Sequence, residues 1–442
     1  MKPLLLTHFT ATSCAGRGLD ATLAALRQQR GGLAPCNFER ADLATWIGAV
    51  EGVDAQPVRD DLRDFECRNN RLAQIGLLQD GFADAVIAAA KRYGPQRVGV
   101  FLGTSTAGIL ETELAYRQRD PESGALPAGF HYAETHNPYS IAAFVRAFFA
   151  LQGPAMSVSS ACSSGAKVFG SARRMLEAGL IDAAVVGGVD SLCLTTLYGF
   201  NSLELLSPEP CKPFDVHRNG ISIGEAAAFA LLERVSEANG QSKVAAGSSG
   251  AAILLLGIGE SSDAYHMSSP HPEGLGARLA IEQALASGGV AAHEVDYINL
   301  HGTATPSNDT AESLAVKAVF DGTPCSSTKG ATGHTLGAAG ALEAVIAALS
   351  LREQCLPAGI NTTQPDPQLA LNYHLESRPA KLRTVMSNSF GFGGTNCSLL
   401  FGRADYRNPT GVADRRHEHS QADGEMRGKP GNGQAMNQDT SQ

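Results

Sequence analysis

The sequence has little charge, and its apolar residues never gather into a long run. Only 18% of the 442 residues are Asp, Glu, Lys or Arg, below the roughly 25% typical of soluble domains, so much of the chain must be buried. The longest apolar runs, such as 251–256, are far shorter than the roughly 18 residues that cross a bilayer, and we expect no membrane span. The formal net charge of −9 disfavours nucleic acid and anionic membranes as main partners, because neither attracts an acidic surface.

Cysteine pairs of the C-x-x-C type are also missing. Nine cysteines lie scattered between Cys14 and Cys397, which fits neither a disulfide framework nor a zinc site. The N-terminal segment MKPLLLTHFTATSC has one Lys, a short apolar stretch and no A-x-A pattern, so we expect no signal peptide. We therefore predict a cytoplasmic protein whose cysteines are mostly reduced and buried, with any exception being reactive.

What the sequence does contain is an alternation of short apolar runs and helical patterns. The apolar runs are bounded by Gly, Ser or Pro and are typical of buried strands; they cover 97–103, 155–160, 183–189, 226–232, 295–301 and 397–402. The helical patterns repeat apolar residues at three- and four-residue steps; they cover 71–92, 138–151, 163–178, 276–287, 309–320 and 336–352. Strands that alternate with helices predict an α/β fold.

Two segments of the chain resemble each other. Residues 159–179 and 330–351 both place small residues around a reactive side chain, Cys162 or His334, and then continue as a helix. Small side chains would let these helices approach closely with their N-termini together, which predicts two similar halves that meet near residue 250. A chance similarity of two Ala- and Gly-rich helices is the alternative. Farther on, 404–442 is polar and rich in Gly, Asn and Gln, so we expect a disordered tail.

Cys162 lies where a strand-like segment gives way to a helical one. At such a turn the helix dipole, about half a positive charge, and unpaired backbone amides favour the thiolate. The small neighbours in SACSSG leave the sulfur open to a bulky substrate, as covalent catalysis requires. The alternative is an inert, buried cysteine, which is the more common role of a cysteine taken alone.

Two histidines lie in turns rich in Gly and Thr. His301 follows the strand-like VDYINL and His334 precedes a long helical pattern, so both would meet Cys162 if the halves pack as proposed. Each one alone would more often be a structural or surface residue. A metal site is disfavoured, because Asp309 and Glu312 follow His301 by eight and eleven residues, unlike the i, i+4 spacing of helical zinc motifs.

A glycine-rich turn joins two strand-like stretches within 387–401. Gly391, Gly393 and Gly394 allow backbone amides to come close to a ligand, which is one way to build an oxyanion hole. The GFGG sequence lacks the G-x-G-x-x-G spacing, and no Walker motif is present, so nucleotide binding is disfavoured.

Five sequence blocks occur in a characteristic order. They are SSACSSGA with Cys162, KPFDVHRNGISIGEAAAFALLE, HGTATPSNDTAE with His301, STKGATGHTLGAAG with Lys329 and His334, and NSFGFGGTN with Phe390 and Phe392. In order and rough spacing, over about residues 1–403, the chain resembles the β-ketoacyl-acyl carrier protein synthases of the ketosynthase I/II group. The resemblance implies a thiolase-like α/β fold, a five-layer α-β-α-β-α sandwich of two related halves. Residues 1–250 would carry the nucleophile and 251–403 the two histidines.

The resemblance implies an acyltransferase that performs a decarboxylative Claisen condensation. Cys162 would attack an acyl thioester on an acyl carrier protein; malonyl-carrier would then lose CO2, and the enolate would attack the acyl-cysteine. Neutral His301 and His334 would donate hydrogen bonds to the enolate oxygen. Backbone N–H groups of Cys162 and Phe392 would form the oxyanion hole, and the Phe392 ring would gate the acyl pocket. We expect no metal and no cofactor apart from the phosphopantetheine that carries the substrates.

Further supporting roles are implied by the resemblance alone. Lys329 and Glu312 correspond to a buried pair that orients His334. Thr303 and Thr305 match hydroxyls that hold the pantetheine arm.

The resemblance also implies partners. For an acidic carrier protein, Arg59, Arg63, Arg68 and Arg71 are spaced so that several could share an exposed face, although the acidic residues between them favour a mixed, solvated face. The family is usually dimeric, which would place the strand near 155–160 at a two-fold interface. The second subunit would be another copy or a chain-length-factor-like protein.

Departures from the family pattern leave the pathway open. Asn219 stands where many relatives have Asp, which predicts a changed local turn. The short region 104–137 replaces a loop that often lines the acyl pocket, so a specialised polyketide or aryl-polyene pathway is an alternative to fatty acid synthesis. A thiolase would need a second cysteine, for which Cys397 is the candidate, although a buried structural thiol fits its position better. A non-catalytic chain-length partner would lack Cys162.

Overall fold

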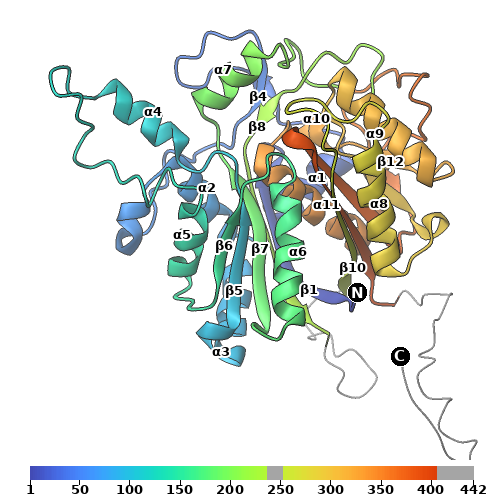
Figure 1. Cartoon of the computed structure of the whole chain (residues 1–442), viewed down its shortest axis with the longest axis horizontal. Coiled ribbons are helices and arrows are strands. Elements are labelled where there is room, and N and C mark those ends of the chain that lie inside the picture. The colour runs from blue at the N-terminus through green and yellow to red at the C-terminus, as the bar shows by residue number, and fades with distance from the viewer. Residues whose placement is uncertain (236–251, 406–442) are drawn as a thin grey trace, which may run out of the picture. The chain divides into compact units, whose positions relative to one another are not determined.

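The structure, a computed structural model, describes residues 1–235 and 252–405, and eleven strands of this part form one mixed sheet (Figure 1). These strands are β1 (Leu4–Ser13), β2 (Gly16–Arg17), β5 (Val98–Gly103), β6 (Ala155–Val158), β7 (Ala183–Asp190), β9 (Ala226–Arg234), β10 (Ile253–Ser262), β11 (Tyr297–Asn299), β12 (Cys325–Ser326), β15 (Thr384–Gly391) and β16 (Thr395–Arg403). Their order is β12-β11-β15-β16-β10-β1-β9-β7-β5-β6, with β2 beside β1. The predicted boundary near residue 250, and the predicted tail from 406 on, lie outside the described residues.

Helices and short strands surround this sheet. The α-helices are α1 (Leu19–Arg27), α2 (Arg68–Leu77), α3 (Phe82–Tyr93), α4 (Ile109–Arg117), α5 (Ser140–Phe148), α6 (Ser164–Glu177), α7 (Leu194–Ser202), α8 (Leu275–Gly288), α9 (Pro306–Val319), α10 (Lys329–Thr332) and α11 (Ala339–Glu353). A 3-10 turn, η4 (Leu336–Ala338), leads into α11. The short strands are β3 (Ala34–Pro35), β4 (Trp46–Gly48), β8 (Ile223–Gly224), β13 (Cys355–Leu356) and β14 (Arg378–Pro379).

The two halves of this single sheet form two separate layers, with helices outside and between them. The resulting five layers confirm the predicted α-β-α-β-α sandwich. From left to right, Figure 1 shows α2 and α5, then β6, β5 and β7, then α6 and α11, and then α8. The helices α2, α3 and α5 share a core with the outer face of β5, β7 and β9, and α8 and α9 share one with the outer face of β11, β15 and β16. Alternate strand residues face opposite layers: Val98, Val100 and Leu102 pack outward, whereas Phe101 packs inward against α6. Because both faces are covered, the strands read as continuous apolar runs.

The two halves of the sheet have the same pairing pattern. Along β1-β9-β7-β5-β6, the successive pairs are antiparallel, antiparallel, parallel and parallel. Along β10-β16-β15-β11-β12 the sequence of pairings is the same. The halves join where β1 pairs with β10, and α6 and α11 follow the last strand of each half. The helix α11 is buried from Ala339 to Leu351, as its apolar surface predicts.

Two predicted elements differ in the structure. The single helix predicted over 71–92 is wrong, because α2 and α3 are separated by a turn in which Asp80 and Gly81 have φ of 55° and 68°; a left-handed pair of residues cannot continue a helix. The strand predicted as buried at 155–160 is half-exposed, because β6 is the last strand of the sheet.

Within residues 1–235 and 252–405, no single helix is long and apolar enough to cross a membrane. Only α2 and α3 taken together reach that length and apolarity, and this pair is bent by 78°.

Candidate active site

Cys162 lies in the short turn between β6 and α6, as the sequence predicts. Ala161, just before it, has a φ of 51°, a left-handed conformation that is uncommon for a residue with a side chain. The Ser164 hydroxyl holds this turn, because it accepts the N–H of Ser160 at 2.9 Å and donates to the Ala161 carbonyl at 2.6 Å. The sharp bend places Cys162, which is 5% exposed, in the wall of a cavity.

Glycines allow α6 and α11 to touch at their N-terminal turns. A Cβ atom on Gly165 would lie 2.7 Å from the backbone nitrogen of Ala341, and one on Gly340 would lie 2.7 Å from that of Ala166. Two helices can approach this closely only where side chains are missing. The predicted contact between these helix starts is therefore confirmed.

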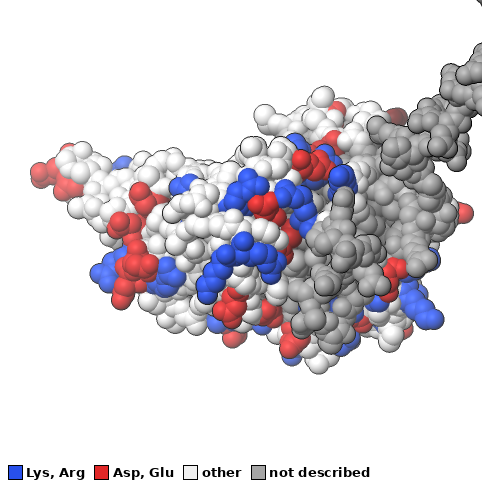
Figure 2. Space-filling model, turned by 90° about the horizontal axis from the view of Figure 1, so that it is seen from below, with Lys and Arg blue, Asp and Glu red and all other residues white. Residues whose placement is uncertain are grey.

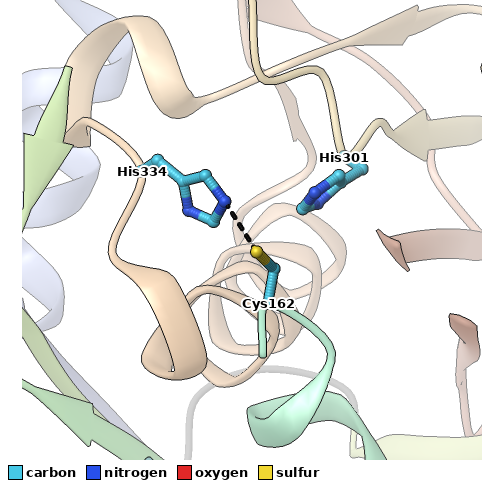
Figure 3. Close-up of side chains that lie close together, drawn as sticks. All are labelled: Cys162, His301 and His334. Carbon is cyan, nitrogen blue, oxygen red and sulfur yellow. Dashed lines mark hydrogen bonds between the residues drawn. The ribbon is translucent and has the colours of Figure 1, made fainter. Parts of the chain in front are cut away.

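The two histidines meet Cys162 from the C-terminal half of the sheet, and the three side chains point toward one another (Figure 3). Nε2 of His334 lies 3.1 Å from Sγ of Cys162, and the imidazole rings of His301 and His334 are 5.4 Å apart in an edge-on arrangement. One reactive atom from each of the three residues lies within 4.8 Å of the others, and all three residues are buried. The predicted convergence of the three side chains is confirmed.

Hydrogen bonds to the far side of each imidazole determine which nitrogen carries the proton. The N–H of Leu336 donates to Nδ1 of His334 at 3.1 Å, and the Lys329 ammonium lies 3.3 Å from Nδ1 of His301. An ammonium only donates, so in both neutral rings Nδ1 accepts and Nε2 keeps the hydrogen. Burial, with the nearby charge of Lys329, holds the pKa of both imidazoles well below the usual value. The site therefore contains two neutral N–H donors.

Lys329 is buried beside His301 and forms an ion pair with Glu343 of α11. Its ammonium also donates to the His301 carbonyl at 2.6 Å. The prediction that Lys329 pairs with Glu312 and orients His334 is therefore wrong, because the cation contacts the other histidine and a different carboxylate. Glu312 instead accepts the backbone N–H groups of His301 and the next residue, both at 2.8 Å, and so fixes the turn that carries His301.

Glu343 is a residue that the sequence analysis missed. The sequence did indicate an unusual role for this residue, because Glu343 is the only charged residue between 336 and 351, a segment that is apolar almost all round. A buried carboxylate is costly unless a cation or several donors face it. A lone Glu in such a helix thus predicts a buried cation opposite it.

The thiol of Cys162 is protonated at neutral pH, which corrects the expectation of a favoured thiolate. Burial raises the pKa of Cys162 to about 11, although the charge of Lys329 and the N–H groups of Phe392 and Cys162 itself act in the opposite direction. The effect of desolvation on the pKa of this thiol is thus larger than the opposite effect of the helix start. The two N–H groups lie close to the sulfur, and their role as an oxyanion hole stays a prediction.

The same three reactive atoms have a spacing that would suit a soft cation. The Lys329 ammonium already lies 3.3 Å from Nδ1 of His301, and it would repel a second positive charge. The donor set is better suited to donating hydrogen bonds to a developing anion.

Comparison with known proteins agrees with this geometry. Residues 73–238 match the N-terminal domain of the beta-ketoacyl synthases, and residues 251–363 match the C-terminal domain. The chain belongs to the beta-ketoacyl synthase family. The resemblance found in the sequence is confirmed.

Two relatives and one solved structure of this family cover between 69% and 91% of the chain. It is 32% identical to 3-oxoacyl-[acyl-carrier-protein] synthase 2 of Vibrio cholerae over 422 residues, which are 90% of this chain and 99% of that protein. It is 35% identical over 313 residues to nodulation protein E of Rhizobium meliloti, covering 69% and 75%. A chain in the structure of a ketosynthase in complex with its chain length factor, from Xenorhabdus doucetiae, is 38% identical with a TM-score of 0.78, covering 91% and 98%.

The cavity of this beta-ketoacyl synthase is lined by the residues predicted to hold the pantetheine arm. Thr303 and Thr305 both line it, and their hydroxyl oxygens are 2.9 Å apart. Thr305 also begins α9, because its side chain accepts the N–H of Asn308. The N–H of Thr303 donates to Asp309 at 3.0 Å, which fixes the hydroxyl pair relative to His301.

Phe392 lies at the wall of this cavity, next to the sulfur. Its ring is 5.6 Å from that of Phe200, a residue of α7 that the sequence analysis did not single out. Phe390, in contrast, is buried, and its ring is 6.0 Å from His301. Phe200, Phe390 and Phe392 all line the cavity, while the role of Phe392 as a gate stays a prediction.

The four arginines predicted to face a carrier protein are not equivalent. The Arg68 side chain is only 6% exposed and forms an ion pair with Glu225, so the prediction that it lies on an exposed face is wrong. Arg59 and Arg63 are exposed but paired with neighbouring Asp residues. On the face shown in Figure 2, too, Lys and Arg are interspersed with Asp and Glu. A mixed, solvated surface is what the acidic neighbours of these arginines favour.

Two other predictions concern single residues. Asn219 accepts a hydrogen bond from the Ser207 hydroxyl at 2.6 Å, and the change of the local turn relative to the family stays a prediction. Cys397 is fully buried in β16, and burial raises the pKa of its thiol. It has the position of a structural thiol.

Proposed function

We propose that this beta-ketoacyl synthase condenses an acyl group held on Cys162 with malonyl-acyl carrier protein and releases CO2. The observation that carries the proposal is the meeting of one thiol with two imidazole N–H donors within 4.8 Å. A group no larger than a thioester touches all three. Relatives named 3-oxoacyl-[acyl-carrier-protein] synthase 2 from several bacteria support the same reaction.

In the first half-reaction, the acyl group moves from the carrier to Cys162. A bond forms between Sγ and the thioester carbon, and the bond from that carbon to the carrier sulfur breaks. The N–H groups of Cys162 and Phe392 stabilise the oxyanion that forms between these two events. Since the pKa of the Cys162 thiol is about 11, its proton departs as the bond forms, and it ends on the released carrier thiol.

In the second half-reaction, malonyl-carrier loses its carboxylate. The bond to the carboxylate carbon breaks, CO2 leaves, and the electron pair forms an enolate whose oxygen accepts hydrogen bonds from Nε2–H of His301 and His334. The enolate carbon then bonds to the acyl carbon, and the bond to Cys162 breaks. The sulfur leaves as a thiolate and takes up one proton from the solvent, because the loss of CO2 from the malonyl carboxylate releases none.

The neutrality of both imidazoles favours this step. A cationic imidazolium would bind the malonyl carboxylate before reaction and so stabilise the ground state. A neutral donor interacts most strongly with the oxygen that becomes negative in the transition state, and only such differential binding accelerates a reaction. The low pKa of both histidines, which keeps the two rings uncharged, therefore favours decarboxylation.

We also propose an acyl carrier protein and a second, chain-length-factor-like subunit as partners, in a specialised polyketide or aryl-polyene type of pathway. Structures of ketosynthases with a chain length factor, at 38% and 27% identity, support this choice. Within the described residues, β6 pairs on one side only, and Met156 in it is 38% exposed. An unpaired strand edge is a template for pairing with another chain.

The thiolase alternative is disfavoured by the position of the second cysteine. Cys397 is fully buried in β16 and does not line the cavity, so it cannot exchange protons with a substrate there. The non-catalytic alternative is disfavoured by the presence of Cys162 together with both imidazoles.

Intact-mass spectrometry with acyl-carrier thioesters tests the proposal. We expect the wild type and the Cys397→Ala control to gain the mass of one acyl group, and Cys162→Ala to gain none while keeping its fold by circular dichroism. Acylation of Cys162→Ala at the wild-type rate would refute the nucleophile. CoA-dependent acyl exchange without CO2 release from malonyl-carrier would instead indicate a thiolase.

A further inference from the structure

One buried carboxylate outside the reacting groups contacts both halves of the site. Asp190 ends β7, and its side chain is 0% exposed. Its Oδ1 accepts the Thr104 hydroxyl at 2.7 Å, the Thr106 hydroxyl at 2.9 Å, and the N–H groups of Ser105 and Thr106 at 2.8 Å. Its Oδ2 accepts the N–H of Gly337 at 2.5 Å and that of Ser105 at 3.0 Å.

The donors to Asp190 belong to two distant parts of the chain. Residues 104–106 follow β5 in the N-terminal half, whereas Gly337 lies in η4, which leads into α11. A side chain at Gly337 would not fit, because its Cβ would lie 2.8 Å from Oδ2 of Asp190 and 2.7 Å from the Ser105 hydroxyl. Burial raises the pKa of Asp190, and the donors oppose this effect. A buried carboxylate with this many donors holds the surrounding backbone rigidly.

The turn held through Gly337 is the one that orients His334. Leu336, between them, has a φ of 52°, and its N–H donates to Nδ1 of His334 at 3.1 Å. That bond keeps the hydrogen on Nε2, which faces the sulfur. On the opposite side, the contact toward Cys162 is weaker, because the Ser105 hydroxyl lies 3.5 Å from the Ala161 carbonyl.

We infer that Asp190 is a positioning residue that aims the Nε2–H donor of His334, and that it therefore controls decarboxylation more strongly than acyl transfer. The inference rests on the proposed function, since it divides the two half-reactions between Cys162 and His334. The carboxylate touches no reacting atom. It acts through Gly337 and Leu336.

Asp190→Asn tests this inference with both half-reactions measured separately. The amide places a donor opposite the Gly337 N–H, so we expect CO2 release from malonyl-carrier to fall roughly 10- to 100-fold, while acylation of Cys162 changes less than about threefold. The matched control is Glu233→Gln. Glu233 is a buried carboxylate bonded to Tyr93 and Arg92, and it lies beside the opposite end of β7, about 23 Å from Asp190. We expect it to leave the ratio of the two rates unchanged.

A proportional loss of both half-reactions in Asp190→Asn, or no loss, would overturn the inference. Wild-type protein that shows neither half-reaction would instead overturn the proposed function, so the two failures are distinguishable.

Thr104→Val provides a second test if the asparagine variant does not fold. It removes one hydroxyl donor to Asp190 and keeps the carboxylate, so we expect roughly a threefold slower decarboxylation with unchanged acylation. Nitrogen NMR of His334 gives a readout independent of rate. We expect the Nε2–H tautomer in the wild type and a mixture of tautomers in Thr104→Val; an unchanged tautomer would contradict the positioning role.

Discussion

The N-terminal and C-terminal halves of the sheet have the same pairing pattern but different connections to their central helices. After β6, five residues lead to α6, and Cys162 is the fourth of them. After β12, twelve residues lead to α11, and they carry Lys329 and His334. The shared framework brings two helix starts to one point. The length of each connection then decides whether that half supplies a nucleophile on a tight turn or a cation and a hydrogen-bond donor on a longer one.

The two connections also differ in charge. The N-terminal turn contributes a thiol whose pKa is raised by burial, and the C-terminal connection contributes the ammonium that opposes this effect. The same ammonium lowers the pKa of both imidazoles. One half therefore tunes the reactivity of the other, and variants in each half should have separable effects.

The largest expected effect is a loss of condensation without a loss of acylation, which would assign the two half-reactions to different halves of the molecule. In His334→Ala, we expect condensation to fall about 10²- to 10³-fold, because one oriented donor to the enolate is lost, while acylation of Cys162 continues. Acyl-enzyme formation by intact mass and product formation by chromatography measure the two steps. His374→Ala, a half-buried histidine outside the site, is the control. Equal loss of both steps would show that the halves do not divide the chemistry.

The next effect concerns the contact between the halves. Gly340→Ala places a methyl group 2.7 Å from the backbone nitrogen of Ala166, so we expect a loss of about 1–3 kcal/mol in the free energy of unfolding, measured by urea denaturation. Gly199→Ala is the control, because it lies in α7 with open space around it. If both substitutions gave the same stability, close packing of α6 and α11 would not be essential.

A smaller effect tests how one half tunes the other. The charge of Lys329 lowers the pKa of the Cys162 thiol, and the charge of Glu343 raises it. Lys329→Met should therefore slow alkylation of Cys162 at pH 9, and Glu343→Gln should speed it, by roughly threefold to tenfold each. Arg352→Met, at the far end of α11, should change neither rate. Shifts in the same direction for both site variants would contradict this electrostatic account.

The smallest effect sharpens the role of the C-terminal turn in binding. Thr303→Val removes a hydroxyl from the cavity but keeps the backbone bond to Asp309, so KM for the carrier thioester should rise roughly threefold to tenfold, as expected for one hydrogen bond, with kcat nearly unchanged. Steady-state kinetics provide the measurement. Thr22→Val, a buried hydroxyl in α1, is the control. A fall in kcat alone would assign Thr303 to the chemical step instead.

Several structural features could be predicted because they depend on local patterns. Alternating strands and helices indicated the α/β class, the apolar surface of α11 indicated its burial, and the small residues around Cys162 indicated a turn before a helix. The break between α2 and α3 was missed, although Asp80 and Gly81 form a common turn pair. The partner of Lys329 was also missed, although Glu343 is the only charged residue between 336 and 351; the sequence indicated that Glu343 needs a buried cation, and only the structure shows which cation that is.

By itself, the sequence determined the reactive side chains, their order along the chain and the small residues that let two helices touch, because these depend on residue type and spacing. Only the tertiary structure decided the state of those groups. The pKa of Cys162 and the tautomer of His301 depend on burial and on groups from residues far away in sequence. The tautomer of His334, in contrast, is set by the N–H of Leu336, two residues along the chain. The pairing of Lys329 with Glu343 and the two-sided contact of Asp190 likewise arise only when the two halves close around the site.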